Sequence, residues 1–345
     1  TIKWGSQGTT KRYYCKQCKK SFSVDHGKKD PAFWIHHVDG TPFRKLGDQI
    51  QISAKQIYLK VKLAINLLPW NWQLTKDLCD PKLVSGILIM DGKYVAVKGY
   101  DKKIPFIYCI DYLTHDIVHG DLFTVEDEIS FSMFFQKIKD LGYQLKIVVA
   151  DDRASIKQAL NRVFPRACLQ LCHNHFLHNI RTDLKIKTVD TYKDFFFLMQ
   201  KQIFINGKGE YSIEEGYRKT WVEGAKGNRF LQNILLDIYR RKTELFNYLK
   251  VPNSPNNTNL IELYNSHLNG RLKTIKGFQS FESARRWLNA WMIRRRTKTF
   301  TDCDKKFKHL NKHAALEFTI KKQARWPDIL TNLGINKVKF FEKSD

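Results

Sequence analysis

The sequence predicts an α/β fold, with a mixed β-sheet in the first half of the chain that is followed by a long helical stretch. Residues 83–122 hold several apolar runs of β type joined by short turns, which indicates antiparallel order. The later run QLKIVVAD is apolar throughout, as expected of a central strand that is buried on both faces. Between them, EDEISFSMFFQKIKDLG has the spacing of an amphipathic helix.

The composition indicates a folded basic chain with a polyanionic partner. Hydrophobic residues make up 43% of the 345 residues, enough for a large core and two or three domains. Lys and Arg number 59 against 34 Asp and Glu, and the resulting charge of +25 is spread along the chain. Solvated basic faces would also give such a composition. A surplus of this size on a folded chain nevertheless favours nucleic acid as the partner.

Several protein classes are disfavoured by the sequence. No run of eighteen apolar residues occurs, so no membrane span is predicted, and no amphipathic anchor helix marks either end. The first residues, TIKWGSQGTT, contain no apolar signal core, so no secretion signal is expected. Seven scattered cysteines favour a reducing compartment over a disulfide-rich secreted domain. We therefore expect the cytoplasm, in association with the nucleoid, in a prokaryote, or the nucleus in a eukaryote.

Residues 1–30 are interpreted as a partial zinc-ribbon-like segment. In RYYCKQCKKSFS, Cys15 and Cys18 are separated by two residues and flanked by aromatic and basic residues, which is typical of one knuckle of a zinc ribbon. A ribbon binds Zn²⁺ through four ligands. Either the first pair precedes the sequence given, or the site is completed by a histidine: His26, His36 or His37. A redox role is disfavoured because the pair lacks a preceding strand and a following helix.

Residues 31–75 are interpreted as a helix-turn-helix DNA-binding domain and a linker. Three short helices are expected over residues 31–68, the last of them capped by Ser53. Ile57, Val61 and Ile65 would form its buried stripe. Four residues lie off that stripe and are candidates for DNA contact: Lys55, Gln56, Tyr58 and Lys62. A plain helical hairpin that links two domains is the alternative.

The rest of the chain is divided by pattern into four segments. Over residues 76–180 the predicted order β-β-β-α-β-α-β matches an RNase H-like core, of which this would be the first part. Residues 181–255 are predicted to be an all-α insertion. Residues 256–300 would complete the core with two helices, and residues 301–345 form a basic C-terminal segment. The PWNW and DLCDPK segments place the boundary before the core near residue 75.

Three carboxylates are placed where they could hold divalent cations. Asp91 and Asp151 each end an apolar run, and in an RNase H-like sheet their strands are neighbours. Converging carboxylates repel each other, and hard cations such as Mg²⁺ or Mn²⁺ relieve that repulsion. Glu262 would complete a site for two ions on a helix with a polar face, and two ions can drive phosphodiester exchange. Asp152 remains an alternative to Asp151, and the aspartate that is not the ligand could cap the next helix.

Three blocks resemble those of the Mutator-like DDE transposases and the related transposases of bacterial insertion sequences. VVADDRASIKQALNRVFPRACLQLCHNHFLHNI is similar to the block around the family's second aspartate, which contains a Cys-x-x-His. ILIMDGKYV resembles the first block, and TNLIELYNSHLNGRLKTIKGFQSFESA resembles the third. The resemblance implies an RNase H-like catalytic core, Asp91, Asp151 and Glu262 as the acidic triad, and a helical insertion before the Glu helix. The chain departs from the family at Asp152, where a glycine is usual.

The cysteine and histidine residues in and after the last predicted strand of the core admit two interpretations. Cys172 and His175 match the family's Cys-x-x-His, which would lie close to the triad. Zinc binding is the alternative, with further candidate ligands at Cys168, His173 and His178. Strand alternation would place Cys172 and His173 on opposite faces, which disfavours zinc. The favoured role is structural, with Cys172 packed and His175 hydrogen-bonded near the active site or in contact with the DNA backbone.

Basic residues on and after the Glu helix are candidates for contact with the DNA backbone. They interleave with aromatic residues, although a solvated basic face is the simpler explanation. The candidates are Arg271, Lys273, Arg294, Arg295 and Arg296.

The sequence therefore predicts a DNA transposase. It would bind terminal inverted repeats, cleave DNA to leave a 3′-hydroxyl, and join that hydroxyl to target DNA with no covalent enzyme intermediate. The resemblance implies a homodimer or higher oligomer on double-stranded DNA, because two element ends are cut. Two alternatives are a domesticated sequence-specific DNA-binding protein with an inactive core and an RNase H-like endonuclease.

Overall fold

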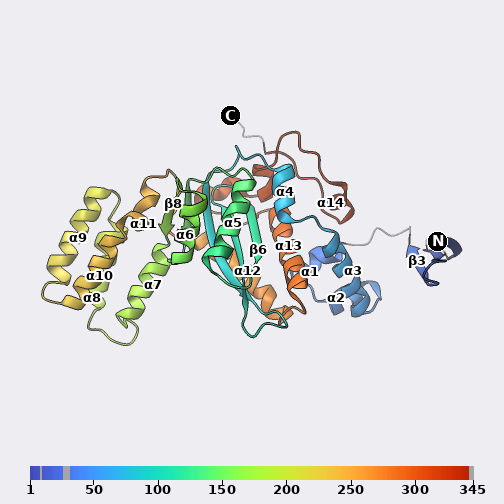
Figure 1. Ribbon diagram of the computed structural model, residues 1–345, viewed down its shortest axis with the longest axis horizontal. Coiled ribbons are helices and arrows are strands. Elements are labelled where there is room, and N and C mark those ends of the chain that lie inside the picture. Colours follow the sequence, from blue (N-terminus) through green and yellow to red (C-terminus); the bar gives the residue numbers. More distant parts are fainter. Residues whose placement is uncertain (8–9, 26–31, 342–345) are drawn as a thin grey trace. The chain divides into compact units, whose positions relative to one another are not determined.

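The computed structural model describes residues 1–7, 10–25 and 32–341, and these form two compact units (Figure 1). The larger unit comprises Leu68–Pro327 and the residues from Lys337 onward. The smaller unit comprises Thr1–Leu67 together with Asp328–Asn336. None of the described helices is long and apolar enough to cross a membrane.

A five-stranded mixed sheet forms the centre of the larger unit, in the order β6-β5-β4-β7-β8. The first three strands are antiparallel hairpin neighbours, and the last two run parallel to β4. The element order predicted for residues 83–180 is confirmed, and the larger unit has a mixed α/β fold. The strands are β4 (Ile87–Val95), β5 (Ile104–Asp111), β6 (Ile117–Leu122), β7 (Ile147–Ala150) and β8 (Cys168–Leu171).

Helices cover both faces of this sheet because its central strands are apolar on both sides. All eight residues of β5 are buried, and alternation sends them to opposite faces. Ile107 and Cys109 join the core under α5 (Glu128–Asp140) and α6 (Ala154–Val163). Tyr108 lies on the opposite face, where its ring packs edge-on against Trp291 of α13 (Phe281–Thr297). Its hydroxyl donates to Asn265 of α12 (Asn259–Ile275) at 2.9 Å.

The segment expected to be an all-α insertion is helical and packs onto the end of the sheet. Gln170 and His173 both bond the Leu245 carbonyl, at 2.7 and 2.6 Å, and Asn247 donates to the Leu169 carbonyl at 2.8 Å. Its elements are α7 (His173–Asp183), α8 (Lys193–Met199), the π-helix η1 (Gln200–Ile205), α9 (Glu210–Gly224), α10 (Arg229–Arg240), α11 (Lys242–Phe246) and the 3-10 helix η2 (Asn247–Leu249).

Two predicted boundaries differ from the structure. The larger unit begins at Leu68 and not near residue 75, because α4 (Asn71–Leu78) packs against β6 and α13. The segment 301–345 is not simply a basic surface. Its 3-10 helices η3 (Lys305–Leu310) and η4 (Ala315–Phe318) bury leucines in the larger unit, whereas α14 (Asp328–Asn332) belongs to the smaller unit. These contributions come from a region whose apolar residues are too widely spaced to show a period.

The smaller unit contains the three helices expected over residues 31–68. They are α1 (Phe33–Asp39), α2 (Phe43–Ile50) and α3 (Ala54–Leu67). Ser53 caps α3 through Gln56, as predicted, and the predicted stripe of three aliphatic residues is buried. Lys55, Gln56, Tyr58 and Lys62 are all exposed, as a DNA-contacting surface requires. Trp34 donates to the Leu333 carbonyl at 2.8 Å and so attaches the segment around α14 to this unit.

The predicted zinc-ribbon segment contains a three-stranded antiparallel sheet, β1 (Ile2–Gln7), β2 (Thr10–Tyr14) and β3 (Ser21–Asp25). Cys15 and Cys18 lie in the turn between β2 and β3, which is closed by a 2.9 Å bond from Cys15 N to Lys20 O. Hydrogen bonds to Cys18 lower the pKa of Cys15, which favours the thiolate that zinc requires. His26 lies outside the described residues, so the zinc site stays a prediction.

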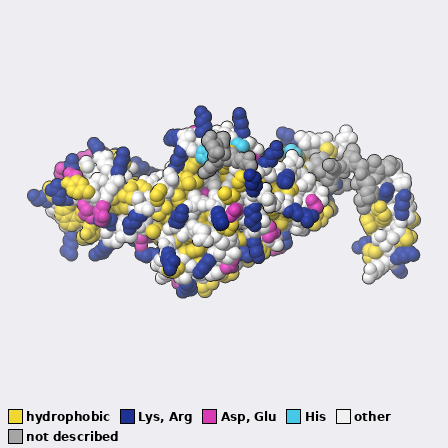
Figure 2. All heavy atoms as spheres, turned by 90° about the horizontal axis from the view of Figure 1, so that it is seen from above, with side chains coloured by type: hydrophobic (Ala, Val, Ile, Leu, Met, Phe, Trp, Pro, Cys, Tyr) yellow, Lys and Arg dark blue, Asp and Glu magenta, His cyan; other side chains and the backbone are white. Residues whose placement is uncertain are grey.

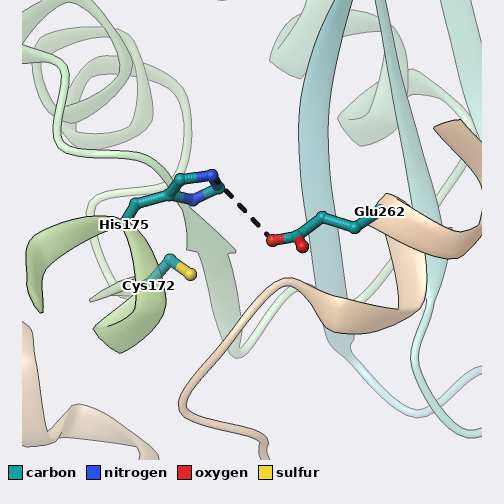
Figure 3. Close-up of side chains that lie close together, drawn as sticks. All are labelled: Cys172, His175 and Glu262. Atoms are coloured by element: carbon teal, nitrogen blue, oxygen red, sulfur yellow. Dashed lines mark ion pairs between the residues drawn. The ribbon is translucent and has the colours of Figure 1, made fainter. Parts of the chain in front are cut away.

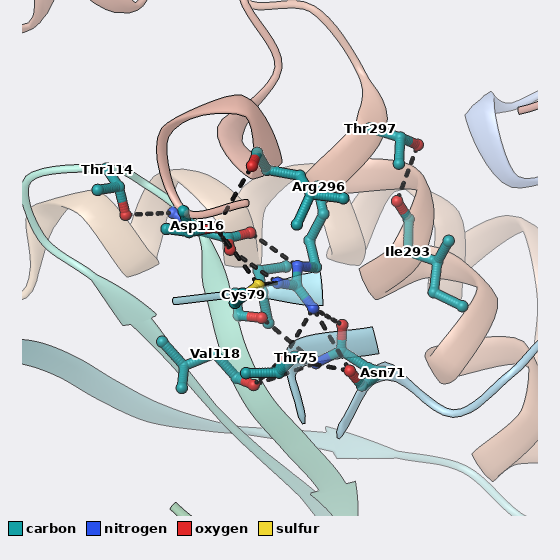
Figure 4. Close-up of polar contacts among 12 residues, drawn as sticks. Asn71, Thr75, Cys79, Thr114, Asp116, Val118, Ile293, Arg296 and Thr297 are labelled. Atoms are coloured by element: carbon teal, nitrogen blue, oxygen red, sulfur yellow. Dashed lines mark hydrogen bonds and ion pairs between the residues drawn. The ribbon is translucent and has the colours of Figure 1, made fainter. Parts of the chain in front are cut away.

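A buried ion pair joins four parts of the larger unit (Figure 4). Arg296 of α13 is 1% exposed and binds both carboxylate oxygens of Asp116 at 2.7 and 2.8 Å. Its remaining donors reach Asn71, Thr75 and Cys79 at the end of α4. Thr319, next to η4, also donates to Asp116, at 2.6 Å. The prediction that Arg296 contacts DNA is therefore wrong, because its whole guanidinium is used inside the fold.

Replacing Arg296 with Met should lower the free energy of unfolding by about 3–5 kcal/mol, because Asp116 would keep a buried charge without its partner. Urea unfolding measures this change. The control is Arg162→Met, which removes an ion pair with Glu128 from a side chain that is 63% exposed. That change should cost less than about 1 kcal/mol. Equal losses in the two variants would contradict the assigned role of Arg296.

Mild acid should destabilise the fold through His119. This side chain lies on β6 with its ring 5.0 Å from Phe134, and burial lowers its pKa to about 4. In the unfolded chain the pKa lies near 6.5, so the unfolded state binds the extra proton first as pH falls. Stability is therefore lost from pH 6.5 downwards, by on the order of 2 kcal/mol at pH 5.

Thermal unfolding at pH 7.5 and pH 5 should show a smaller drop for His119→Leu than for the wild type. The exposed His178 supplies the control, since His178→Leu should leave the drop unchanged. An unchanged drop in His119→Leu would assign the acid sensitivity to other groups.

Candidate active site

Asp91 lies in the middle of β4 and faces α12. Its Oδ2 accepts a 2.5 Å bond from Asn265 of α12, and its Oδ1 accepts from the Gly92 amide at 2.7 Å. A Cβ at position 92 would meet the end of the Glu126 side chain, which would have to shift. Glu126 is itself held by the Tyr94 hydroxyl at 2.5 Å. A further acid thus lies close to the Asp91–Gly92 pair.

Asp151 lies beside Asp91 because of the register of two parallel strands. Ile89 of β4 is paired with Val149 of β7. Residues 91 and 151 each lie two positions further along these neighbouring parallel strands. Side chains two residues apart share a face of a sheet, so both carboxylates point to the same side. The convergence of these two acids was predicted from neighbouring strands, and the register supports it.

Glu262 approaches from the first turn of α12. Its Oε1 accepts a 2.9 Å bond from the hydroxyl of Thr258, which precedes the helix. Asn265, one turn later, makes the bond to Asp91 and has its own oxygen bonded by Tyr108. The polar face predicted for this helix therefore faces the acids on the sheet.

His175 lies between Asp151 and Glu262, and Figure 3 shows its ion pair with Glu262. Its Nδ1 lies 2.5 Å from Asp151 Oδ1, and its Nε2 lies 3.9 Å from Glu262 Oε1. Cys172 is buried beside it, with Sγ 3.2 Å from the Thr258 hydroxyl. The structure thus places the packed cysteine and the hydrogen-bonded histidine at the acids, in the arrangement that the sequence favoured.

The argument from strand alternation is wrong for this motif. Strand β8 ends at Leu171, and α7 begins at His173 with Cys172 as its N-cap residue. Residues 172 and 175 therefore lie together at the start of a helix. Ligand atoms of Cys172, His175 and Glu262 come within 4.8 Å of one another. Among the described residues, none of the other three zinc candidates, Cys168, His173 and His178, belongs to such a group.

The electrostatics of the cluster show an excess of negative charge around one cation. Burial, and then the charge of Asp151, raise the pKa of Asp91 to about 6. Hydrogen bonds to Asp151 and then Cys172 raise the pKa of His175 to about 11, which keeps the imidazole protonated. Burial raises the pKa of Cys172, but hydrogen bonds with His175 and Thr258 lower it by more. A protonated histidine thus partly offsets the repulsion between the carboxylates.

The two adjacent aspartates are separated in role by their partners. Asp151 meets His175, whereas Asp152 pairs with Arg241 between α10 and α11. Arg241 also binds Asp237 at 3.1 Å. Asp152 does not cap α6, whose N-cap residue is Arg153 without a side-chain bond. The geometry therefore supports Asp151, and not Asp152, as a member of the acidic cluster.

Comparison with known proteins agrees with this chemistry. The model of the family described as "Transposase, Mutator family" matches residues 88–300, which include all three acids. The chain belongs to the Mutator family of transposases. Within that family, the transposases for the insertion sequence element IS256 in transposon Tn4001 of Staphylococcus aureus and of Enterococcus faecalis are each 27% identical to it over 172 residues. The match covers 49% of this chain and 43% of those relatives.

Two solved structures of transposases show distant similarity. The Drosophila P element transposase strand transfer complex is 11% identical, with a TM-score of 0.34 and 81% coverage of each chain. The Mos1 transposase paired-end complex with the left transposon end is 11% identical, with a TM-score of 0.20, and covers 63% of this chain and 79% of that one.

The basic residues predicted to contact DNA lie in different settings. On α12, Lys273 is exposed and Arg271 donates to Thr274 at 3.0 Å. Arg294 and Arg295 are half-buried on α13, and the Arg295 guanidinium lies 4.6 Å from the ring centre of Tyr264. These four side chains keep a solvent-facing part, in contrast to Arg296.

Sequence reasoning missed the residues that hold the acids in place. Thr258, Glu126 and Arg241 each contact a member of the cluster or its neighbour, yet they lie in loops or at helix ends. Only Thr258 had a local signal, because a threonine before a helix with Glu four residues later can bond that glutamate.

In the absence of metal, Asp91→Asn should stabilise this protein by on the order of 1–2 kcal/mol at pH 7.5. The pKa of Asp91 is raised from 3.8 to about 6 in the fold, so ionisation above pH 6 opposes folding. Asparagine removes that charge. The melting temperature in EDTA measures the effect, and Asp152→Asn is the control because it loses the ion pair with Arg241. A melting temperature lowered to the same extent in both variants would contradict the prediction that the charge of Asp91 destabilises the fold.

Proposed function

We propose that this protein cleaves DNA at the ends of a mobile element and joins the freed 3′-hydroxyls to target DNA. The observation that carries this proposal is the placement of Asp91 and Asp151 on adjacent parallel strands, with Glu262 of α12 facing Asp151 across His175. Membership of the Mutator transposase family supports it. The named relatives are described as transposases, and the family model matches a segment of this chain that includes all three acids.

The donor set fits the divalent cations that such chemistry uses. Asp91, Asp151 and Glu262 offer hard oxygen ligands. Burial, and then the charge of Asp151, raises the pKa of Asp91, and a bound cation would favour its ionised form. These three side chains would hold two Mg²⁺ or Mn²⁺ ions. When bound, two such ions activate a water or a 3′-hydroxyl and stabilise the leaving oxygen.

The other residues of the cluster position the three acids. Asn265 fixes one oxygen of Asp91, and Thr258 fixes one oxygen of Glu262. His175 orients Asp151 and supplies a positive charge beside Glu262. Partners of this kind hold ligands within the narrow geometry that metal sites require.

The surfaces around the core suit a DNA partner. Lys and Arg side chains are spread over the face drawn in Figure 2, in line with the net charge of +25. We assign recognition of terminal inverted repeats to the exposed face of α3, with Lys55, Gln56, Tyr58 and Lys62. Backbone contacts are assigned to the four basic side chains that remain accessible: Arg271, Lys273, Arg294 and Arg295. Cleavage of two ends in one complex would require a homodimer or higher oligomer, and Cys15 and Cys18 would contribute to a Zn²⁺ site.

Glu262→Gln should abolish Mg²⁺- or Mn²⁺-dependent cleavage and joining of element-end DNA, with a loss of at least about 10³-fold. Binding of the same DNA should be retained, because Gln keeps the size and the hydrogen bond to Thr258. The measurement is product formation on duplexes taken from the DNA that flanks the gene. Glu282→Gln, an exposed change on α13, serves as the matched control and should keep activity.

The same assay separates the alternatives. Binding without cleavage in the wild type would favour a domesticated DNA-binding protein with an inactive core. Cleavage without end specificity or joined product would favour a plain RNase H-like endonuclease.

A further inference from the structure

An open hollow of about 450 Å³ lies where the loop between β4 and β5 meets the loop between α12 and α13. Four exposed lysines and a single acid, Asp101, contribute its charged groups. Within the part of the chain that the structure describes, none of these lysines is paired with a carboxylate. The lysines are Lys98, Lys102, Lys103 and Lys276. The hollow therefore concentrates positive charge that no described group of the protein neutralises.

The walls of the hollow are fixed by backbone hydrogen bonds. Phe278 donates to the Ala96 carbonyl at 2.9 Å and accepts from the Lys98 amide at 2.8 Å. The side chain of Phe278 is buried, and its ring centre lies 5.7 Å from that of Trp287. Gly277, with φ of 142°, adopts a conformation that side chains disfavour and lets the two loops meet. The lysines thus project from a preformed frame, which lowers the entropy lost on binding.

Both walls lead back to the acidic cluster. Helix α12 runs from Glu262 in its first turn to Ile275 at the hollow, about 20 Å at the helical rise. Strand β4 and its continuation run from Asp91 to Ala96 at the hollow, about 17 Å in extended chain. The bond between Asp91 and Asn265 joins the two elements at the other end. A separation of about 20 Å corresponds to about six base pairs of duplex DNA.

We propose that this hollow binds the phosphodiester backbone of the DNA being cleaved, about five to six base pairs from the phosphate at the acidic cluster. The proposal rests on DNA being the substrate, as proposed above. Lysines act as point charges on phosphates, and phosphate contacts carry no direct sequence information, so this contact contributes affinity and register. Lys273 lies on α12 between the cluster and the hollow, on the side of the helix that carries Glu262, and extends the basic track toward the cluster.

The test compares two variants that lose four charges each. One carries Gln at the four lysines of the hollow, and the other carries Gln at four exposed lysines of the helical insertion. Those control positions are Lys185, Lys187, Lys201 and Lys208. Fluorescence anisotropy measures the Kd for an element-end duplex at several salt concentrations in Ca²⁺, and melting temperatures check that both variants fold.

In the hollow variant, Kd at 0.15 M salt should rise roughly 10- to 100-fold, and the slope of log Kd against log salt should fall by about three. The control variant should shift both quantities much less. Equal shifts in the two variants would mean that the loss of four positive charges anywhere on the protein weakens binding, which would overturn the proposal.

Neutral methylphosphonates placed one at a time along the duplex locate the contact. A substitution about five to six base pairs from the cleaved phosphate should weaken binding of the wild type but not of the hollow variant, because the partner charges are already gone. Such coupling on the element side or on the flanking side supports the proposal and identifies which DNA is held. Absence of coupling at every position overturns it.

This result is distinguishable from failure of the proposed function. If wild type binds the duplex and shows the coupling but never cleaves, the hollow is a DNA site on a catalytically inactive protein. If wild type cleaves and joins while the hollow variant keeps the wild-type Kd and salt slope, the transposase function stands and the hollow plays no part in it.

Discussion

The structure depends on one electrostatic constraint, which is that two carboxylates lie side by side, one in the middle of β4 and one just after the end of the parallel strand β7. The pairing of Ile89 with Val149 brings Asp91 and Asp151 together, and neither can move without changing the register of a buried sheet. The neighbouring polar groups offset that repulsion or fix the positions of the carboxylates. Asn265 donates to one acid, His175 brings a proton to the other, and the Thr258 hydroxyl positions the third. The fold thus maintains a charge arrangement that is unfavourable by itself, as functional sites often do.

Around that centre, polar side chains are used inside the protein in two different ways. The acidic cluster leaves its groups accessible and incompletely compensated. The pair of Arg296 and Asp116 is fully enclosed, and each of its hydrogen-bonding groups has a partner on α4, α13 or the turns beside them. Both arrangements contain paired charges, but only the acids of the first remain partly exposed to solvent. Both sites contain charged residues. The candidate active site differs from the structural network because its carboxylates are accessible and their charges are not fully compensated.

The sequence predicted the sheet, the helical insertion and the three acids because each depends on local periods or on residues at strand ends. Glu262 was proposed from the polar face of its helix, and the resemblance supported that choice. Arg296 was misjudged because three consecutive arginines suggest a basic surface. Helical spacing from the buried Asn289 and Met292 places residue 296 inward, and that spacing was available in the sequence. The alternation argument used for Cys172 and His173 failed because strand β8 ends at Leu171 and Cys172 is the N-cap residue of α7.

Strand β8 is the last strand of the sheet, and its outer edge is not left open. The Gln170 side chain donates to the Leu245 carbonyl and accepts from the Tyr248 amide at 2.8 Å, while Asn247 bonds the carbonyl of Leu169. The insertion therefore acts as a lid over hydrogen-bonding groups that would otherwise recruit strands from other molecules. A protein shortened by joining the end of β8 directly to α12 would lose this cover and gain a tendency to aggregate. The helical segment thus helps to prevent this sheet from pairing with strands of other molecules.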